Sequence, residues 1–332
     1  MVVLFLNTLV LLGCNKASNS AENASVDKYS VTKVPQILSY DPKTIQLNDL
    51  TFSYVEAGQG ELIVFLHGFP YFGASWDKLL QPLSKKYHVV APDNRGYGYT
   101  DKPKAVTDYK IATLVEDVRL LINLLANNKK IILIGHDWGG VLAWGVAQQY
   151  PELVSKAIVI NAPPFNAFIN SLANNNSQRE ASHYIPKMSG WLAKGYFAIK
   201  GSGVLWGDGL EKMHNEGHID DAFKLAFLAS WNEEGAIDSA LNWYKANLPA
   251  FDEIDSSTYW PQQSDNQALA KIKVPSLLIW SQGDKAFTED TFNEIPKHVS
   301  NMQIKIINTD SHAPQLDHSE VVLTYIRAFI SE

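Results

Sequence analysis

The sequence predicts an α/β protein with a mostly parallel central sheet flanked by helices and with an inserted helical cap. Short apolar runs typical of buried strands alternate with helical patterns up to about residue 163. The same alternation resumes near residue 268, after an aromatic-rich stretch with helical spacing. We therefore expect a core built from residues 36–163 and 268–332, and a cap domain, residues 164–267, that closes over it.

The N-terminal residues predict export. Residues 2–12 are mostly apolar and too short to span a bilayer, which is typical of a signal peptide. Residues 1–14 end in L-L-G-C, which resembles a bacterial lipobox with Cys14 as the lipidated residue. Residues 15–35, rich in Ser, Ala and Asn, predict a flexible tether. The chain would then be a membrane-anchored lipoprotein of the bacterial cell envelope or periplasm.

An alternative follows from the charge of this segment. No Lys or Arg precedes Cys14, which departs from an ordinary signal peptide. A misplaced start codon would instead give a cytoplasmic enzyme. Cys14 is the only cysteine, so no intrachain disulfide is possible.

The most informative element is a strand that runs into a tight turn. Residues 131–140 read I-I-L-I-G-H-D-W-G-G, and residues 140–150 predict a helix that ends before Pro151. Gly135 and Gly139 have the spacing of a nucleophile elbow, where strand and helix backbones approach closely. Asp137 occupies the tip, although an ordinary turn aspartate is the alternative interpretation.

An aspartate at this position changes the chemistry that the elbow can perform. A serine needs a base to become nucleophilic, whereas a carboxylate with an ordinary pKa of about 3.9 is ionised at neutral pH. A carboxylate attacks sp³ carbon bonded to halide or to the oxygen of a strained ring. We therefore predict that Asp137 forms an alkyl ester, which a base and oxyanion donors must then help to hydrolyse.

Two later strands supply the base and the acid that orients it. Residues 276–280 are followed by S-Q-G-D, which offers Asp284, and residues 303–307 are followed by N-T-D-S-H-A-P, which offers His312. Nucleophile, acid and histidine thus follow one another in the order expected for this elbow. A turn aspartate and a surface histidine are the alternatives. Asp310 and Asp317 are other candidate acids, but they share the loop of the histidine and would have to fold back.

Backbone donors for the oxyanion are expected from two loops. The N–H of Trp138 follows the nucleophile, and the loop H-G-F-P after the strand at residues 61–66 offers the N–H of Phe69. His67 and His136 lie beside these donors. Because turns need polar support there, we assign both histidines structural roles.

Four motifs together carry a family resemblance. They are H-G-F-P at residues 67–70, P-D-N-R-G-Y-G at 92–98, D-K-P at 101–103 and G-H-D-W-G-G at 135–140. From about residue 39 onward the chain resembles the soluble epoxide hydrolase branch of the α/β-hydrolase fold superfamily. These Asp-nucleophile hydrolases are related to haloalkane dehalogenases. The resemblance implies an α/β-hydrolase fold and the hydrolysis of an epoxide to a vicinal diol.

Departures from related families support this choice. Haloalkane dehalogenases usually carry an asparagine where this chain has Phe69, and fluoroacetate dehalogenases usually carry an arginine where it has Trp138. The resemblance also implies two cap tyrosines that protonate the epoxide oxygen. L-N-W-Y-K-A-N at residues 241–247 points to Tyr244, and A-S-H-Y-I at 181–185 points to Tyr184. A packed core aromatic is the alternative for Tyr244.

The need for an acid also follows from chemistry. An alkoxide is a far stronger base than a halide, so ring opening at neutral pH requires a proton donor such as a phenol, with an ordinary pKa of about 10. The expected partners are a small apolar epoxide and water. A haloalkane dehalogenase with the same ester cycle and a non-catalytic, lipid-anchored ligand-binding protein are the alternatives.

Composition and spacing argue against other partners. The net charge of -7 speaks against nucleic acid, since a basic stripe is lacking. His214 and His218 have a spacing that could bind zinc, but Gly217 weakens that helix and Glu216 is misplaced for H-E-x-x-H. We expect neither a metal nor a cofactor. The sequence leaves open which epoxide is used and the oligomeric state.

Overall fold

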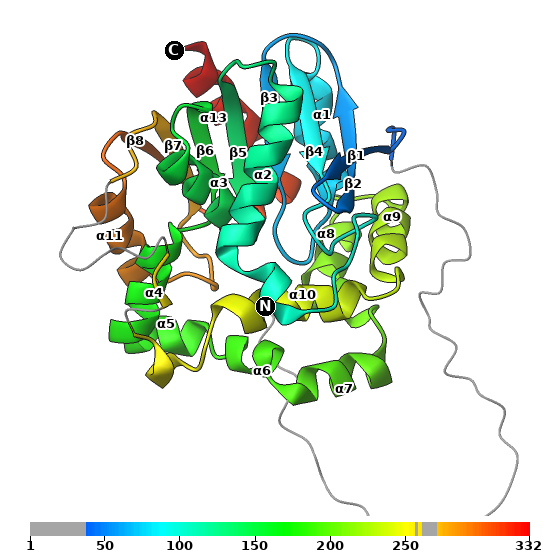
Figure 1. Ribbon diagram of the computed structural model, residues 1–332, viewed down its shortest axis with the longest axis vertical. Helices are drawn as coiled ribbons and strands as arrows, with labels where there is room; N and C mark the ends of the chain where they lie inside the picture. The colour runs from blue at the N-terminus through cyan, green and yellow to red at the C-terminus, as the bar shows by residue number, and fades with distance from the viewer. Residues whose placement is uncertain (1–37, 256–257, 261–270) are drawn as a thin grey trace, which may run out of the picture.

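The computed structural model describes residues 38–255, 258–260 and 271–332 of the chain (Figure 1). The predicted signal peptide, Cys14 and the predicted tether lie outside the described residues. So do residues 261–267 at the end of the predicted cap.

A single sheet organises the core. In the described residues it has eight strands in the order β1-β2-β4-β3-β5-β6-β7-β8. β1 and β2 pair in antiparallel fashion, as do β2 and β4, and every later pair is parallel. The strands are β1 (Lys43–Leu47), β2 (Leu50–Ala57), β3 (Leu62–Leu66), β4 (His88–Pro92), β5 (Ile131–His136), β6 (Val154–Ile160), β7 (Ser276–Ser281) and β8 (Met302–Ile307).

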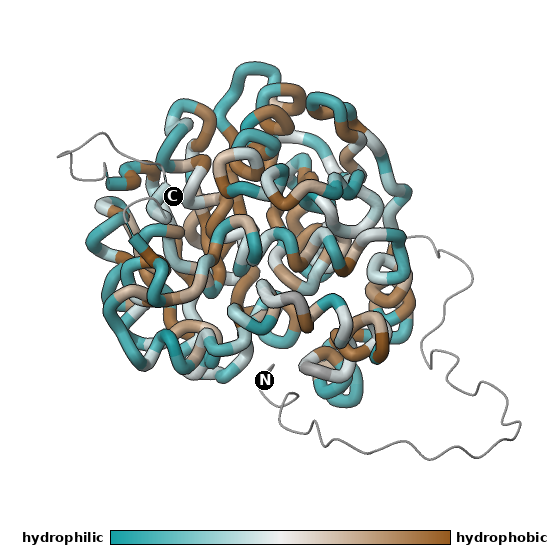
Figure 2. The backbone as a smooth tube through the Cα atoms, turned by 60° about the horizontal axis from the view of Figure 1, so that its bottom comes forward, coloured by the Kyte–Doolittle hydropathy of each residue, from teal (hydrophilic) through white to brown (hydrophobic). Residues whose placement is uncertain are grey.

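Helices bury both faces of this sheet. α2 (Ile111–Leu125) and α3 (Trp138–Gln149) cover one face, and α1 (Asp77–Leu83) and α13 (Ser319–Ser331) cover the other (Figure 1). The central strands β3 and β5 are nearly continuous runs of Ile, Leu and Val, as expected for parallel strands buried on both sides, whereas β1 and β8 at the edges are largely exposed. β3, β5 and β7 are buried throughout, and the hydrophobic segments concentrate in the middle of the molecule (Figure 2).

The fold class predicted from the sequence is confirmed, with local differences. The helix predicted from residue 140 begins at Trp138, directly after Asp137. The pair β1 and β2 was not expected, because both strands mix polar and apolar residues. Its signal is the Asn48-Asp49 turn, where Asn48 adopts a positive φ of 54°.

The helices between β6 and β7 form the cap. They are α4 (Phe165–Asn174), α5 (Asn176–Ala181), α6 (Ile185–Ser189), α7 (Trp191–Lys200), α8 (Glu211–Asn215), α9 (Asp221–Trp231) and α10 (Ala236–Asn247). They lie together at one end of the sheet (Figure 1). α4 packs against α11 (Glu289–His298) of the core, and α6, α7 and α9 pack against α10.

Several short helical elements lie in the connections. They are η1 (Gly73–Trp76), η2 (Val106–Tyr109), η3 (Trp206–Leu210), η4 (Phe251–Glu253) and α12 (Pro314–Asp317).

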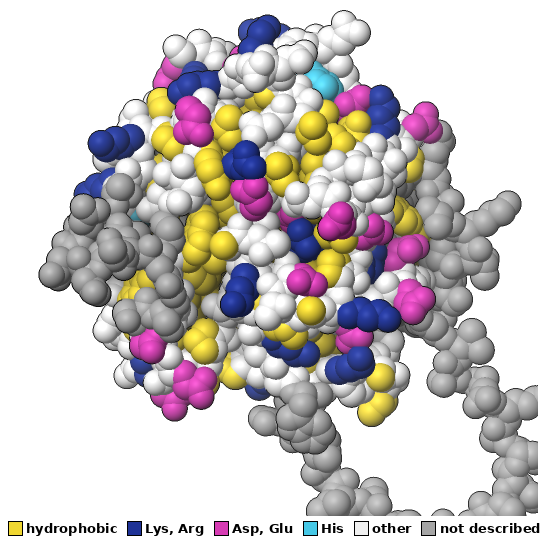
Figure 3. All heavy atoms as spheres, viewed as in Figure 1, with side chains coloured by type: hydrophobic (Ala, Val, Ile, Leu, Met, Phe, Trp, Pro, Cys, Tyr) yellow, Lys and Arg dark blue, Asp and Glu magenta, His cyan; other side chains and the backbone are white. Residues whose placement is uncertain are grey.

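Within the described ranges, no helix has the length and apolar character needed to cross a bilayer. Basic and acidic side chains are interspersed over the described part of the face in Figure 3. That face therefore lacks the basic stripe that binds phosphate backbones.

Candidate active site

Asp137 lies at the tip of a strained turn between β5 and α3. Its backbone has φ 52° and ψ -126°, which non-glycine residues rarely adopt. The flanking glycines permit the turn: a Cβ on Gly135 would lie 2.3 Å from the Gly139 carbonyl oxygen, and one on Gly139 would lie 2.0 Å from that of Leu66. Only glycine fits at either position.

The predicted oxyanion donors surround the Asp137 carboxylate. The Phe69 N–H donates to Oδ1 at 2.9 Å, and the Trp138 backbone N–H is also hydrogen-bonded to the carboxylate. Gly68 makes room for this arrangement, because a Cβ there would lie 2.3 Å from Oδ1. With Oδ1 held by donors, Oδ2 is the oxygen that faces His312.

The predicted base and acid come together with the nucleophile. His312 Nε2 lies 3.5 Å from Asp137 Oδ2, and His312 Nδ1 lies 2.8 Å from Asp284 Oδ2. The other Asp284 oxygen accepts the Ala286 N–H at 2.8 Å. The Asp284 side chain is fully buried, so its contacts with solvent are replaced by these two partners.

The alternative acids lie elsewhere. Asp317 Oδ1 is 2.7 Å from His318 Nδ1, so that carboxylate has its own histidine. Asp310 is exposed to solvent. Asp284 is thus the carboxylate that orients His312.

The charges of the site stabilise one another. Burial alone would lower the pKa of His312, but the carboxylates of Asp284 and Asp137 raise it to about 10. Burial acts to raise the pKa of Asp137, yet hydrogen bonding and the charge of His312 hold it below its ordinary value. The free enzyme therefore contains an ionised Asp137 beside a protonated His312.

Both predicted tyrosines reach the site from the cap. Tyr184 precedes α6 and Tyr244 lies on α10, and their ring centroids are 6.4 Å apart. The Tyr244 ring also stands edge-on to Trp138 and Phe69, at 5.5 Å and 5.9 Å. Burial raises the pKa of both phenols, and the charge of Asp137 raises both further. Both phenols are therefore neutral.

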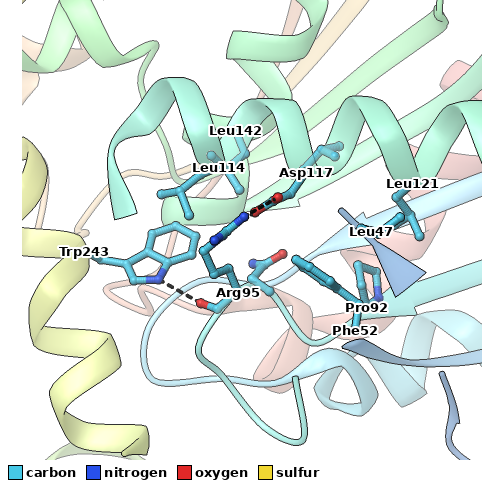
Figure 4. A pocket seen from close by; sticks show the side chains of 11 residues that line it. Leu47, Phe52, Pro92, Arg95, Leu114, Asp117, Leu121, Leu142 and Trp243 are labelled. Atoms are coloured by element: carbon cyan, nitrogen blue, oxygen red, sulfur yellow. Dashed lines mark hydrogen bonds and ion pairs between the residues drawn. The ribbon is translucent and has the colours of Figure 1, made fainter. Parts of the chain in front are cut away.

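A buried ion pair in the core fixes the helix that carries Tyr244. The Arg95 guanidinium makes two hydrogen bonds to Asp117 on α2, at 2.7 Å and 2.6 Å. The Arg95 carbonyl in turn accepts the indole N–H of Trp243 at 3.0 Å (Figure 4). Because Trp243 directly precedes Tyr244, this contact ties the phenol to the core.

The same face of α10 is held at two further points. Asn247 accepts the Ile111 N–H at 2.7 Å and donates to the Tyr109 carbonyl at 2.8 Å. The Tyr109 hydroxyl lies 2.8 Å from the Ser239 hydroxyl. Ser239, Trp243 and Asn247 are four residues apart and share one helix face. This part of the cap is thus a rigid support for Tyr244.

His67 and His136 have structural surroundings. His67 Nε2 accepts the Asn94 N–H at 3.0 Å, and its Nδ1 lies 3.0 Å from the Gly68 carbonyl. Burial lowers the pKa of His67 to about 4 and that of His136 to about 3. Both rings are therefore neutral. His136 Nε2 donates to the His312 carbonyl at 2.8 Å and so supports the base rather than acting as one.

His214 and His218, weighed above as zinc ligands, each have a separate acidic partner. His214 lies 2.8 Å from Asp221, whereas His218 lies 3.7 Å from Glu216. Among the described residues, no three His, Cys, Asp or Glu side chains are grouped as metal ligands.

Comparisons with known proteins agree with this geometry. A family model described as alpha/beta hydrolase fold matches residues 61–319. Epoxide hydrolase 4 of Homo sapiens is 32% identical over 302 residues, which cover 87% of this chain and 78% of that protein. Epoxide hydrolase 1 of Caenorhabditis elegans is 30% identical over 315 residues, which cover 90% and 72%. The chain belongs to the epoxide hydrolase branch of the α/β-hydrolase family.

A solved structure of this branch has the same architecture. The Bacillus megaterium epoxide hydrolase in complex with an inhibitor superposes with a TM-score of 0.78 at 28% identity, covering 87% of this chain and all of the other. The family resemblance predicted from the four motifs is therefore confirmed.

Proposed function

We propose that this protein hydrolyses epoxides to vicinal diols through a covalent ester on Asp137. The observation that carries the proposal is a pair of neutral tyrosines, the half-buried Tyr184 and the buried Tyr244, near an ionised carboxylate. Ring opening needs a nucleophile and an acid together, because the leaving alkoxide stays attached and strongly basic. The names of the relatives support the same reaction.

Ring opening uses the free carboxylate oxygen. Asp137 Oδ2 attacks one epoxide carbon and the carbon–oxygen bond breaks, while Tyr184 and Tyr244 hydrogen-bond the oxygen and one of them gives it a proton. A hydroxyalkyl ester and a tyrosinate result. No base is needed, because Asp137 is already ionised.

Formation of the ester prepares His312 for the second step. The ester removes one of the two carboxylate charges that hold the proton on His312, so the pKa of His312 falls. The proton can then return to the tyrosinate. His312 becomes neutral while Asp284 keeps its ring oriented.

Hydrolysis then regenerates the enzyme. His312 takes a proton from water, which attacks Cγ of the ester, and the Phe69 and Trp138 N–H groups stabilise the charge that develops on Oδ1. Collapse breaks the Cγ–Oδ2 bond, and the diol leaves with Oδ2 and the proton from His312. The acid proton left on Asp137 passes to His312 and restores the ion pair.

The surroundings of Asp137 fit a small apolar substrate. Phe69 stands edge-on to Trp231 at 5.7 Å and to Tyr244 at 5.9 Å, and Tyr244 in turn stands edge-on to Trp138. These aromatic rings beside two neighbouring phenols favour an epoxide with an apolar substituent.

Product analysis decides between epoxide and halide chemistry. With an aryl epoxide we expect diol, and with a bromoalkane of similar size we expect little bromide, since Phe69 offers no side-chain amide to hold the halide. The assay measures diol by chromatography and bromide by ion chromatography. Bromide release without diol formation would favour the dehalogenase; no product from either would favour a ligand-binding protein.

We further propose that Cys14 carries a lipid anchor that holds the enzyme at the bacterial cell envelope. The apolar run before Cys14 and the Ser-, Ala- and Asn-rich segment after it support the proposal. Cells fed labelled palmitate should yield labelled protein, and Cys14→Ala should abolish the label. Unlabelled wild-type protein in the soluble cytosolic fraction would refute the anchor.

A further inference from the structure

A buried asparagine links the loops of the catalytic acid and base. Asn161 directly follows β6, is fully buried and has a positive φ of 43°. Its backbone N–H donates to the Ile279 carbonyl of β7 at 3.0 Å, which holds it beside the next strand. Sequence analysis assigned it no role.

The Asn161 amide holds the strand that leads to Asp284. Oδ1 accepts the Ser281 N–H at 2.7 Å, and Nδ2 lies 3.0 Å from the Ser281 hydroxyl. Ser281 ends β7, and its carbonyl accepts the Asp284 N–H at 3.2 Å. The amide thus fixes the start of the turn that carries the acid.

The amide nitrogen of Asn161 also holds the backbone of His312. Nδ2 donates to the His312 carbonyl at 2.9 Å and lies 3.1 Å from the Ser311 carbonyl. His136 Nε2 donates to the same His312 carbonyl at 2.8 Å. Because the surrounding carbonyls can only accept and the Ser281 N–H can only donate, one orientation of the amide satisfies the group.

We propose that Asn161 is a positioning residue for ester hydrolysis, acting by fixing the His312 loop relative to the Asp284 loop. The inference rests on the proposed function. Asn161 acts on the base and not on Asp137, so its removal should slow the step that uses His312. A shift of about 1 Å in a catalytic group can cost roughly 10²-fold in rate.

The test separates the two half-reactions. Full-length enzyme in excess is mixed with a reactive aryl epoxide, quenched over time and analysed by intact mass for ester formation and decay. Asn161→Gly removes the side chain while tolerating the positive φ. We expect ester decay to slow by about 10²-fold and ester formation to stay within about threefold, a difference that is small in free energy.

Two further variants sharpen the result. Asn161→Asp keeps the shape but turns the donor into an acceptor facing the two carbonyls, so it should also slow ester decay, and it carries the test if Asn161→Gly does not fold. Asn48→Gly is the matched control, since Asn48 has a positive φ of 54° in an exposed hairpin turn. It should alter neither step.

The outcomes are distinct. Equal slowing of both steps in the folded Asn161 variants, or no slowing of either, would overturn the positioning role. If wild-type enzyme forms diol without any ester, the mechanism proposed for the family site fails instead.

Discussion

Replacing His312 with glutamine is expected to lower steady-state diol formation by roughly 10³-fold, the usual contribution of a general base. Ring opening should survive, because the Asp137 carboxylate needs no base to attack. The variant should therefore consume about one equivalent of epoxide quickly and then stop. Time-quenched assays of epoxide loss and of diol appearance measure ring opening and complete turnover separately.

A histidine remote from the site provides the control. His88 begins β4 at the opposite end of the strands and contacts Glu56 at 3.0 Å. His88→Gln should turn over like wild type. Multiple turnovers at the wild-type rate in His312→Gln would show that His312 is not the base.

The second large effect concerns the phenols. Tyr184→Phe or Tyr244→Phe should slow ring opening by about 10²-fold, because one donor remains, and the double variant should lose nearly all activity. Phenylalanine keeps the ring contacts of Tyr244 with Trp138 and Phe69 and that of Tyr184 with Tyr244, so we expect the fold to persist. Pre-steady-state measurement of ester formation reports the affected step.

A tyrosine remote from the site provides the control for these variants. Tyr325→Phe on α13, whose ring lies by Lys305, should leave ring opening unchanged. A double variant that opens epoxides at the wild-type rate would mean that another group donates the proton.

The sequence predicted those parts of the site that depend on local patterns. The Ile and Leu run before Gly135 identified a buried strand, and the glycine spacing identified the turn at Asp137. Asp284 and His312 could be found because each follows a recognisable strand in the order that this elbow requires. The structure places all three side chains together.

Other features depend on contacts that no local pattern reveals. Arg95 lies in a loop and Asp117 on a helix, and only the packing of these two segments brings the side chains together. The contact of Trp243 with Arg95 adds a third segment. Asn161 looked like an ordinary residue at a strand end. Its position at the end of a predicted strand, just before the cap insertion, was the available signal in the sequence. Tyr184 came from the resemblance alone, since it lies just before a short helix and belongs to no periodic pattern.

The most direct test of the covalent mechanism is the mass of the trapped intermediate. His312→Gln is incubated with a reactive epoxide, and the intact protein and its peptides are analysed by mass spectrometry. We predict an adduct equal to the whole mass of the substrate, located on the peptide that contains Asp137. An adduct lacking the elements of hydrogen halide, formed from a haloalkane, would instead indicate halide displacement. The absence of any adduct, while wild-type enzyme makes diol, would indicate direct attack of water and contradict the ester on Asp137.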